Sequence, residues 1–444
     1  MHRTGSRCNW QLWAMSAVLM FLSWSAVAAQ EDVKPLAEEV EQLVRDLESD
    51  RLEDRDVAEK ELINLAGDTT GSGDKLLELL PQVDPQMPPG LQTRLARIRR
   101  KVDEKLAHAT AGGTKVSLDA QKMPLADVLK AIEEQTGNLL VDHREAFGQE
   151  SLPIEVTLAV QAEPFWQAVD KLLDATGLMI YNFADDGGLA LVARTPGMAP
   201  RVGSASYVGP FRIEATRVEA RRDFRQPENE GLTVNLEVAW EPRLHPILLS
   251  HPLTDLFATN QDSQALPVPN PEQSLDVEIQ SGSPATDLTL PFNLPERTIP
   301  AITLLRGTMR ALVPGRVVKF EFAKLDESKP QTQQRAGVAV TLDRTKREED
   351  ILEVHMRVRL EQPGEALASH RGWIFQNPAY LVDKDGNRID NAGFETTLQN
   401  EAEVGMTYLY DVPAETEGLT WVYETPAAII ETPVAYELRD IKLP

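Results

Sequence analysis

The stretch KVSLDAQKMPLADVLKAIEEQTGNLLV, residues 115–141, decides the fold of the middle of the chain. Apolar and polar residues alternate over Lys115–Leu118, which predicts a strand. Pro124 stands at the first turn of the following helix, where its missing N–H costs nothing. That helix carries an apolar stripe and ends at Thr136-Gly137, because glycine readily adopts the left-handed conformation that closes a helix. Leu139–Val141 is the next predicted strand.

The same order of signals continues to Val192. Ile154–Val160 alternates as a third strand, and Pro164 opens a second helix that closes at Thr176-Gly177. Two apolar segments joined by Asp185-Asp186-Gly187-Gly188 then form a hairpin, because such a turn sequence is favoured between antiparallel strands. The predicted order is strand–helix–strand–strand–helix–strand–strand, with both helices packed on one face of a small sheet.

This region, residues 114–194, resembles a known family, the short N-terminal domain shared by secretins and TonB-dependent receptors. The matching stretches are VSLD (116–119), PLADVL (124–129), QTG (135–137), VTL (156–158) and AVDKLL (168–173). In that family the domain is periplasmic and binds other protein segments. The resemblance therefore implies a docking module in the periplasm.

Residues 1–29 have the pattern of a signal peptide. Arg3 and Arg7 precede an apolar run, Leu12–Val27, and Ala26-Val27-Ala28 supplies the small residues read at a cleavage site. The alternative is a membrane anchor, but a run of about 16 residues is shorter than the roughly 20 that a helical span needs. We therefore expect an exported protein of the periplasm or cell surface, without a membrane span after cleavage. Cys8 is the only cysteine, so the cleaved chain would contain neither disulfides nor thiol chemistry.

Residues 31–109 show apolar residues at helical spacing, as in Leu91, Leu95, Ile98 and Val102. One unit of a HEAT-like helical repeat and a small helical bundle both fit this pattern. Glycines at residues 67–74 predict a break, and Gly71-Ser72-Gly73-Asp74-Lys75 is expected to be a loop, because it lacks the spacing of a phosphate-binding motif.

Short alternating strands separated by prolines and polar turns follow, which predicts two antiparallel β-sandwiches over residues 205–326 and 333–444. An internal repeat supports two copies of one sandwich. Leu232–Val238 is similar to Leu352–Val358, and Val318–Phe322 is similar to Val434–Leu438, at a similar spacing. The expected fold class is multidomain α+β.

The residues predict no catalytic site, no cofactor and no metal centre. His245 and His251 lie beside prolines without the other ligands that a metal site needs. Asp383-Lys384-Asp385-Gly386-Asn387 lacks the remaining ligands of a calcium loop and is expected to be a hairpin turn. A net charge of −24 disfavours nucleic acid and anionic lipid as partners.

Four aromatic residues are candidate partner-binding groups: Trp373, Phe375, Tyr380 and Trp421. Core packing is the alternative explanation for them. The sequence thus favours an exported, non-enzymatic protein that docks other envelope proteins. A glycan- or matrix-binding protein is the alternative, and exposed tryptophans would support it. An envelope hydrolase is a further alternative that requires two acidic side chains facing one cleft.

Overall fold

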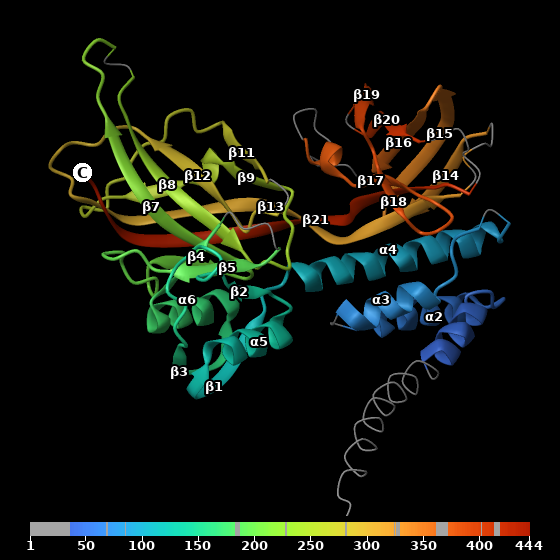
Figure 1. Cartoon of the computed structure of the whole chain (residues 1–444), viewed down its shortest axis with the longest axis horizontal. Helices are drawn as coiled ribbons and strands as arrows, with labels where there is room; N and C mark the ends of the chain where they lie inside the picture. The colour runs from blue at the N-terminus through green and yellow to red at the C-terminus, as the bar shows by residue number, and fades with distance from the viewer. Residues whose placement is uncertain are drawn as a thin grey trace, which may run out of the picture. The chain divides into compact units, whose positions relative to one another are not determined.

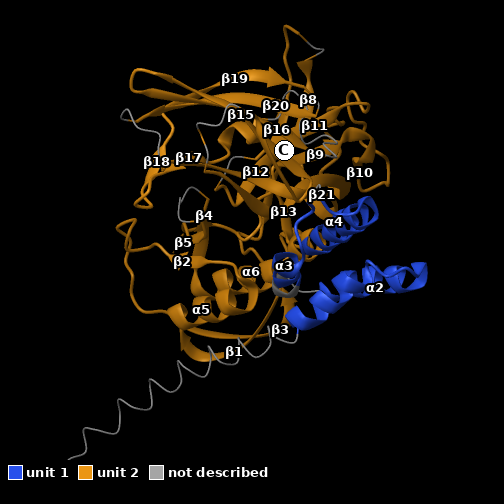
Figure 2. Cartoon of the chain, turned by 90° about the vertical axis from the view of Figure 1, so that its right-hand side faces the viewer, with its two compact units in different colours: residues 1–106 blue, residues 107–444 orange. Residues whose placement is uncertain are grey.

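The computed structural model describes residues 36–67, 70–84, 86–182, 187–226, 229–279, 282–323, 325, 329–360, 372–400, 402–412 and 418–444. The predicted signal peptide lies outside these ranges. The chain divides into two compact units, residues 1–106 and 107–444, which Figure 2 shows in different colours. Helices and several antiparallel sheets together confirm a multidomain α+β protein.

The first unit is helical, as predicted. Its described elements are a helix over 36–46, α2 (Leu52–Leu65), α3 (Thr70–Leu79) and α4 (Pro89–Ala111), whose last residues belong to the second unit. The stripe predicted on the last helix is buried, and Leu95, Ile98 and Val102 lie in the core of this unit. None of the helices in the described ranges combines the length and apolarity that crossing a bilayer requires.

The expectation of a loop at Gly71–Lys75 is wrong, because these residues lie inside α3. Close packing explains why glycine occurs within this helix. A Cβ added at Gly73 would lie 2.5 Å from a methyl carbon of Leu106, a residue of α4. Glycine therefore allows α3 to approach α4 more closely than any other residue would, at a modest cost in helix propensity.

The middle module has the predicted order of elements (Figure 1). They are β1 (Lys115–Pro124), α5 (Leu125–Thr136), β2 (Leu140–Asp142), β3 (Glu155–Pro164), α6 (Phe165–Thr176), β4 (Leu178–Tyr181) and β5 (Leu189–Ala193). Gly137 and Gly177 close the two helices with φ of 70° and 67°, the left-handed conformation expected for them. The predicted hairpin is present as β4 paired antiparallel with β5.

The strands of the module form two sheets instead of the single sheet expected. β1 pairs with β3, whereas β2, β5 and β4 form a separate three-stranded sheet. Helices α5 and α6 contact strands of both sheets. Phe165, Ala168 and Leu173 of α6 are buried in the core of the module, and Trp166 of the same helix donates a hydrogen bond to Pro210 next to the first sandwich. An ordinary amphipathic stripe is only about 100° wide, so the wider burial of this helix reflects contacts with the first sandwich as well as with the module's own strands.

Three antiparallel sheets build the rest of the second unit. The first contains β6 (Ala205–Val208), β7 (Phe211–Arg221), β8 (Gly231–Trp240) and β12 (Ala285–Phe292). The second contains β14 (Gln331–Arg335), β15 (Val338–Glu348), β16 (Ile351–Leu360), β19 (Gly393–Gln399) and β20 (Glu403–Asp411). The third contains β9 (Leu248–Pro252), β10 (Phe257–Thr259), β11 (Ser274–Glu278), β13 (Ala301–Phe322), β17 (Ala379–Val382), β18 (Arg388–Asp390) and β21 (Thr420–Lys442).

The third sheet is shared by two sandwich cores, because β13 and β21 pair over their whole length and run through both (Figure 1). Met309 near the start of β13 and Tyr436 near the end of β21 lie in the first core. Phe320 near the end of β13 and Trp421 near the start of β21 lie in the second core. The end of β13 therefore belongs to the second sandwich, and the end of β21 belongs to the first. The division at residues 326 and 333 consequently does not separate the strands of the two cores.

The strands quoted as an internal repeat occupy matching places in the two sandwiches. β8, which contains Leu232–Val238, lies between β7 and β12, and β16, which contains Leu352–Val358, lies between β15 and β20. The two end segments, Val318–Phe322 and Val434–Leu438, are the parts of β13 and β21 that cross into the other sandwich. The two sandwiches are thus related arrangements that exchange one strand segment each.

Candidate protein-docking site

The two tryptophans proposed as partner-binding groups lie in the core of the second sandwich. Trp421 is 0% exposed and Trp373 is 5% exposed. The Trp421 indole Nε1–H donates to the Tyr410 hydroxyl at 2.9 Å. A buried, hydrogen-bonded indole is unable to stack on a sugar or a partner without local unfolding. The exposed tryptophans on which the glycan-binding alternative depended are therefore not present at these positions.

Tyr380 and Phe375 are also engaged within the protein. The Tyr380 hydroxyl donates to Glu424 Oε1 at 2.7 Å, and the Arg388 guanidinium carbon lies 4.1 Å from the centre of its ring. The partly buried Phe375 ring stacks on Phe394 at 5.9 Å between centroids. The aromatic cluster was visible in the sequence, but its position at the rim and in the core of a sandwich was not.

The described structure instead presents an unpaired sheet edge in the first sandwich. The end of β21, residues 431–442, pairs with β13 on one side, and β17 covers only the start of β21 on the other side. No described strand pairs with the second side of residues 431–442. The Glu437 amide donates to Ser206 Oγ at 3.2 Å, so it points away from β13 towards β6. By the alternation of an extended antiparallel strand, the amides of Ala435 and Arg439 point the same way.

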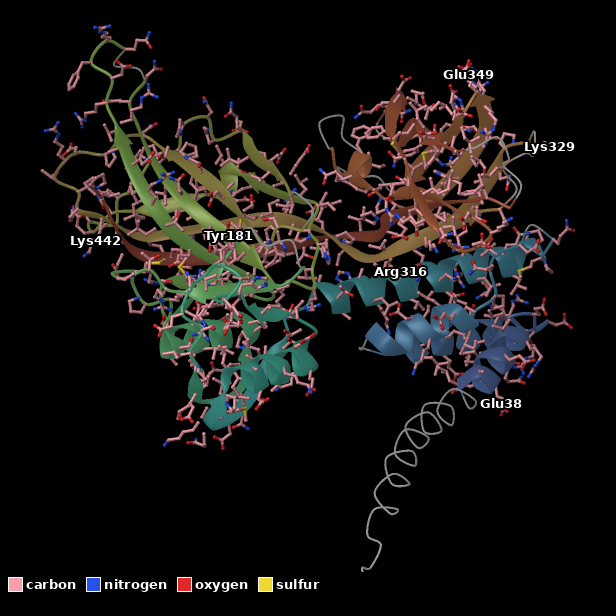
Figure 3. The ribbon with its side chains drawn as sticks, viewed as in Figure 1. Glu38, Tyr181, Arg316, Lys329, Glu349 and Lys442 are labelled. Atoms are coloured by element: carbon pink, nitrogen blue, oxygen red, sulfur yellow. The ribbon has the colours of Figure 1, made fainter. Side chains whose placement is uncertain are left out.

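A hollow of about 800 Å³ lies beside this edge. β6 and β7 line one side of it, and the end of β21 lines the other. Figure 3 labels Lys442, which is one of its lining residues. The lining mixes apolar residues such as Val218 and Ile441 with the exposed cations Arg217 and Arg439. No pattern in the sequence predicts this hollow, because it forms between strands that are far apart along the chain.

The equivalent edge in the second sandwich is closed. There the end of β13 lies beside β14, as the end of β21 lies beside β6. The Gln333 amide donates to the Glu321 carbonyl oxygen at 2.5 Å, and Arg335 Nη1 donates to the Lys319 carbonyl oxygen at 2.7 Å. Long side chains of β14 thus cover the outward carbonyls of β13. At the matching edge of the first sandwich, β6 and β7 lie beside the end of β21, and the contact described there is the hydrogen bond from the Glu437 amide to Ser206 Oγ.

Buried polar groups hold the middle module against the first sandwich. Asp170 of α6 accepts hydrogen bonds from Arg212 of β7, from Arg201 and from the Tyr207 hydroxyl, at 2.8, 2.7 and 2.6 Å. Burial alone would raise the pKa of Glu214, but the adjacent Arg212 guanidinium holds that pKa below its usual value. An ionised Glu214 carboxylate therefore lies beside the buried arginine.

Glu241, next to the start of β7, makes a second polar contact in the same interface. The fully buried Glu241 accepts hydrogen bonds from the Thr114 amide at 2.7 Å, from Asn138 Nδ2 at 3.1 Å and from Arg243 Nε at 2.8 Å. Trp166 Nε1 also donates to the Pro210 carbonyl oxygen at 2.9 Å. Removing residues 116–192 would uncover these charges, so the module and the first sandwich form one structural platform.

A smaller hollow of about 270 Å³ gathers acidic side chains at the sandwich surface. Glu237, Glu278 and Asp287 line it, and Asn182 Nδ2 donates to Glu237 at 3.2 Å. Within the described ranges, no three His, Cys, Asp or Glu side chains are grouped so that they could hold a metal ion. Asp383–Asn387 forms the predicted turn, between β17 and β18, with the Asp383 carboxylate accepting from the Asp385 and Asn387 amides.

Comparison of the chain with family models finds no matching family. Searches of curated proteins and of solved structures likewise find no similar protein.

Proposed function

We propose that this chain is an exported, non-enzymatic scaffold that docks other proteins of the cell envelope. The unpaired edge at the end of β21 is the observation that carries this proposal. An extended segment of a partner adds to such an edge as a further strand, and its main-chain hydrogen bonds supply affinity. The hollow between β6 and β21 accepts the side chains of that segment.

The closed edge of the second sandwich supports this assignment. Exposed strand edges promote unwanted pairing, and proteins therefore cover them unless pairing is used. The Gln333 and Arg335 side chains bond outward carbonyls of β13, whereas no described strand pairs with the outer side of residues 431–442, where the Glu437 amide bonds the Ser206 side chain. The platform formed with the middle module keeps the open edge in a fixed place.

A proline substitution in β21 tests the proposal. The Ala435 amide points away from β13, so Ala435→Pro removes an outward donor while it keeps the ladder to β13. A photo-crosslinking amino acid at position 439 is expected to give a discrete adduct in intact cells, and Ala435→Pro is expected to abolish it. Ala435→Ser and a crosslinker at Lys319, on the covered edge, are the controls. An adduct that survives Ala435→Pro, or no adduct at position 439, would contradict the proposal.

An envelope hydrolase is the second candidate, because the smaller hollow gathers Glu237, Glu278 and Asp287. Paired carboxylates are the groups that glycoside hydrolysis uses. Incubating the protein with envelope glycan, beside its Glu278→Gln variant, separates the two candidates. Product release that the variant lacks would favour the hydrolase over the scaffold.

A further inference from the structure

Strand β12 is the border strand of its sheet and lies beside β8 (Figure 1). Its counterpart in the second sandwich is β20, because the two strands have the same register against the repeated strands β8 and β16. The equivalent pairs are Leu232–Phe292 with Leu352–Tyr410, and Val238–Thr286 with Val358–Val404. Strand β19 pairs with the outer side of β20, whereas no described strand pairs with the outer side of β12. A strand position that is filled in the second sandwich is thus unfilled by the described strands of the first.

The backbone groups of Asp287 and Thr289 point to this outer side. The Trp240 amide of β8 donates to the Pro284 carbonyl oxygen at 3.1 Å, so the even-numbered residues of β12 face β8. Alternation in an antiparallel strand then turns Asp287, Thr289 and Pro291 outward. Pro291 agrees with this direction, since a proline in a border strand has its missing N–H on the outer side. No hydrogen bond from another described residue reaches the outer backbone of Asp287 or Thr289.

The open part of this edge is short, which limits the size of an occupant. The Asn293 amide donates to the Pro267 carbonyl oxygen at 2.9 Å just after β12, and Pro291 offers no N–H. Pairing is therefore restricted to the first residues of the strand, from Ala285 to Thr289. A few residues of extended chain fill that length, as in the recognition of peptides by strand addition.

Two carboxylates lie side by side on one face of this edge. Glu237 of β8 and Asp287 of β12 are direct cross-strand partners, and like charges in that position destabilise a sheet. Glu278, at the end of β11, lines the same hollow of about 270 Å³, and the described lining includes no lysine or arginine. Asn182 gives Glu237 a neutral hydrogen bond at 3.2 Å. Among the described residues, no cation pairs with any of the three acids.

The matching place in the second sandwich contains a cation of its own. Arg357 of β16 stands where Glu237 stands in β8, because each is paired with the equivalent residue of the neighbouring strand. Arg357 pairs with Asp343 at 2.8 Å and with Glu403 at 3.1 Å, so that surface combines both signs of charge. A cation that offsets the acids of the first sandwich would therefore be provided by the segment that pairs with β12.

We propose that the outer side of β12, from Ala285 to Thr289, binds an extended basic segment of a partner protein as an additional strand. The backbone groups of Asp287 and Thr289 bond the segment, and a lysine or arginine opposite Asp287 lies beside the carboxylates. The net charge of −24 attracts such a segment from solution. This inference is independent of the docking edge at β21, and it assigns the acids of the smaller hollow to binding instead of hydrolysis.

Fluorescence anisotropy with labelled peptides tests the proposal. One short capped peptide alternates lysine with valine, and a second has glutamate in place of each lysine. The lysine peptide is expected to bind, more weakly as salt is added, and the glutamate peptide is expected not to bind. Each of Asp287→Asn and Glu278→Gln is expected to lower the affinity about two- to fivefold, the range typical of one exposed ion pair. Glu133→Gln, at an exposed acid on α5, is the control and is expected to bind like the wild type.

Thr289→Pro tests pairing through the backbone. It removes an outward amide and keeps the ladder to β8, so it is expected to abolish binding of the lysine peptide. Thr289→Val is the matched control and is expected to retain binding. Both variants lose the hydrogen bond from Thr289 Oγ1 to Asn235 Oδ1 at 2.7 Å, but only proline removes the amide.

Three results would overturn the proposal: equal binding of the two peptides, equal binding by Thr289→Pro and Thr289→Val, or no binding of the lysine peptide to the wild type. Binding that Ala435→Pro abolishes and Thr289→Pro leaves intact would assign the peptide to the edge of β21. That result would overturn the role of β12 while it supports the docking edge, so the two proposals fail separately.

Discussion

Arg212 Nε donates to Asp170 Oδ2 at 2.8 Å, and both side chains are completely buried. This pair joins helix α6 of the middle module to strand β7 of the first sandwich. Buried pairs of this kind contribute little net stability compared with apolar residues, but breaking one partner leaves an uncompensated charge. The pair therefore makes correct docking of the module a condition for a stable fold.

Asp170→Asn is expected to lower the free energy of unfolding by about 3–5 kcal/mol, because Arg212 then keeps only part of its compensation. Urea denaturation followed by circular dichroism measures the change. Glu219→Gln is the control, since Glu219 pairs with Arg217 on an exposed surface and such pairs contribute about 0–1 kcal/mol. A similar small loss for both variants would show that the buried pair is not structurally important.

Gly307→Ala is expected to destabilise the first sandwich by about 1–3 kcal/mol, the usual cost of overpacking. A Cβ at Gly307 would lie 2.6 Å from His251 Nε2 and 2.7 Å from the Tyr436 hydroxyl oxygen, which are hydrogen-bonded to each other at 2.9 Å. Gly231→Ala is the control, because the nearest atom to its new Cβ is 3.6 Å away. An equal decrease in the melting temperature of the two variants would contradict this explanation.

The free energy of unfolding is expected to fall as the pH decreases below about 6.5, and His251 is expected to contribute to this loss. Burial lowers the pKa of His251 below the usual value near 6.5. In this range the unfolded chain takes up a proton that the folded chain does not, so acid favours unfolding until the folded pKa is reached. His251→Gln is expected to give a shallower decrease between pH 7 and 5, measured by urea denaturation. Parallel curves for the two proteins would exclude this role.

Removing the side chains that cover β13 is expected to open the second edge. Gln333→Ala combined with Arg335→Ala leaves the carbonyls of Glu321 and Lys319 uncovered. Exposed edges pair with one another, so size-exclusion chromatography is expected to show concentration-dependent association. Thr332→Ala, on the same strand, is the control and is expected to elute like the wild type. A double variant that elutes unchanged at all concentrations would mean that these side chains do not protect the edge.

Local signals in the sequence predicted local structure well. The Thr-Gly pairs at residues 136–137 and 176–177 marked the ends of α5 and α6, because a left-handed glycine is a short-range requirement. The same reasoning misjudged Gly71–Lys75, where glycine serves a close approach to Leu106 instead of a turn. The residue that Gly73 packs against, Leu106, belongs to the next helix, α4, so the local sequence around Gly73 does not reveal the contact.

The alternation of apolar and polar residues does not predict which distant strands pair with each other. Alternation in Val318–Phe322 and Val434–Leu438 identified strands and their likeness to each other, but not which core each would enter. The pattern also identified Trp421 and Trp373 without showing which side of the sheet they face. A one-residue change of register reverses that side. The unpaired edge at the end of β21, which depends on which strands lie beside it, is therefore evident only in the structure.

The exchange between β13 and β21 has a consequence for biosynthesis. Because the end of β21 is the last strand segment of the chain, the first sandwich lacks its closing segment until the strands of the second have been made and, in an exported protein, translocated. Sequence-distant pairing of this kind is slow, and the incomplete intermediate exposes apolar surface to aggregation. The two sandwiches are consequently expected to fold together and not one after the other.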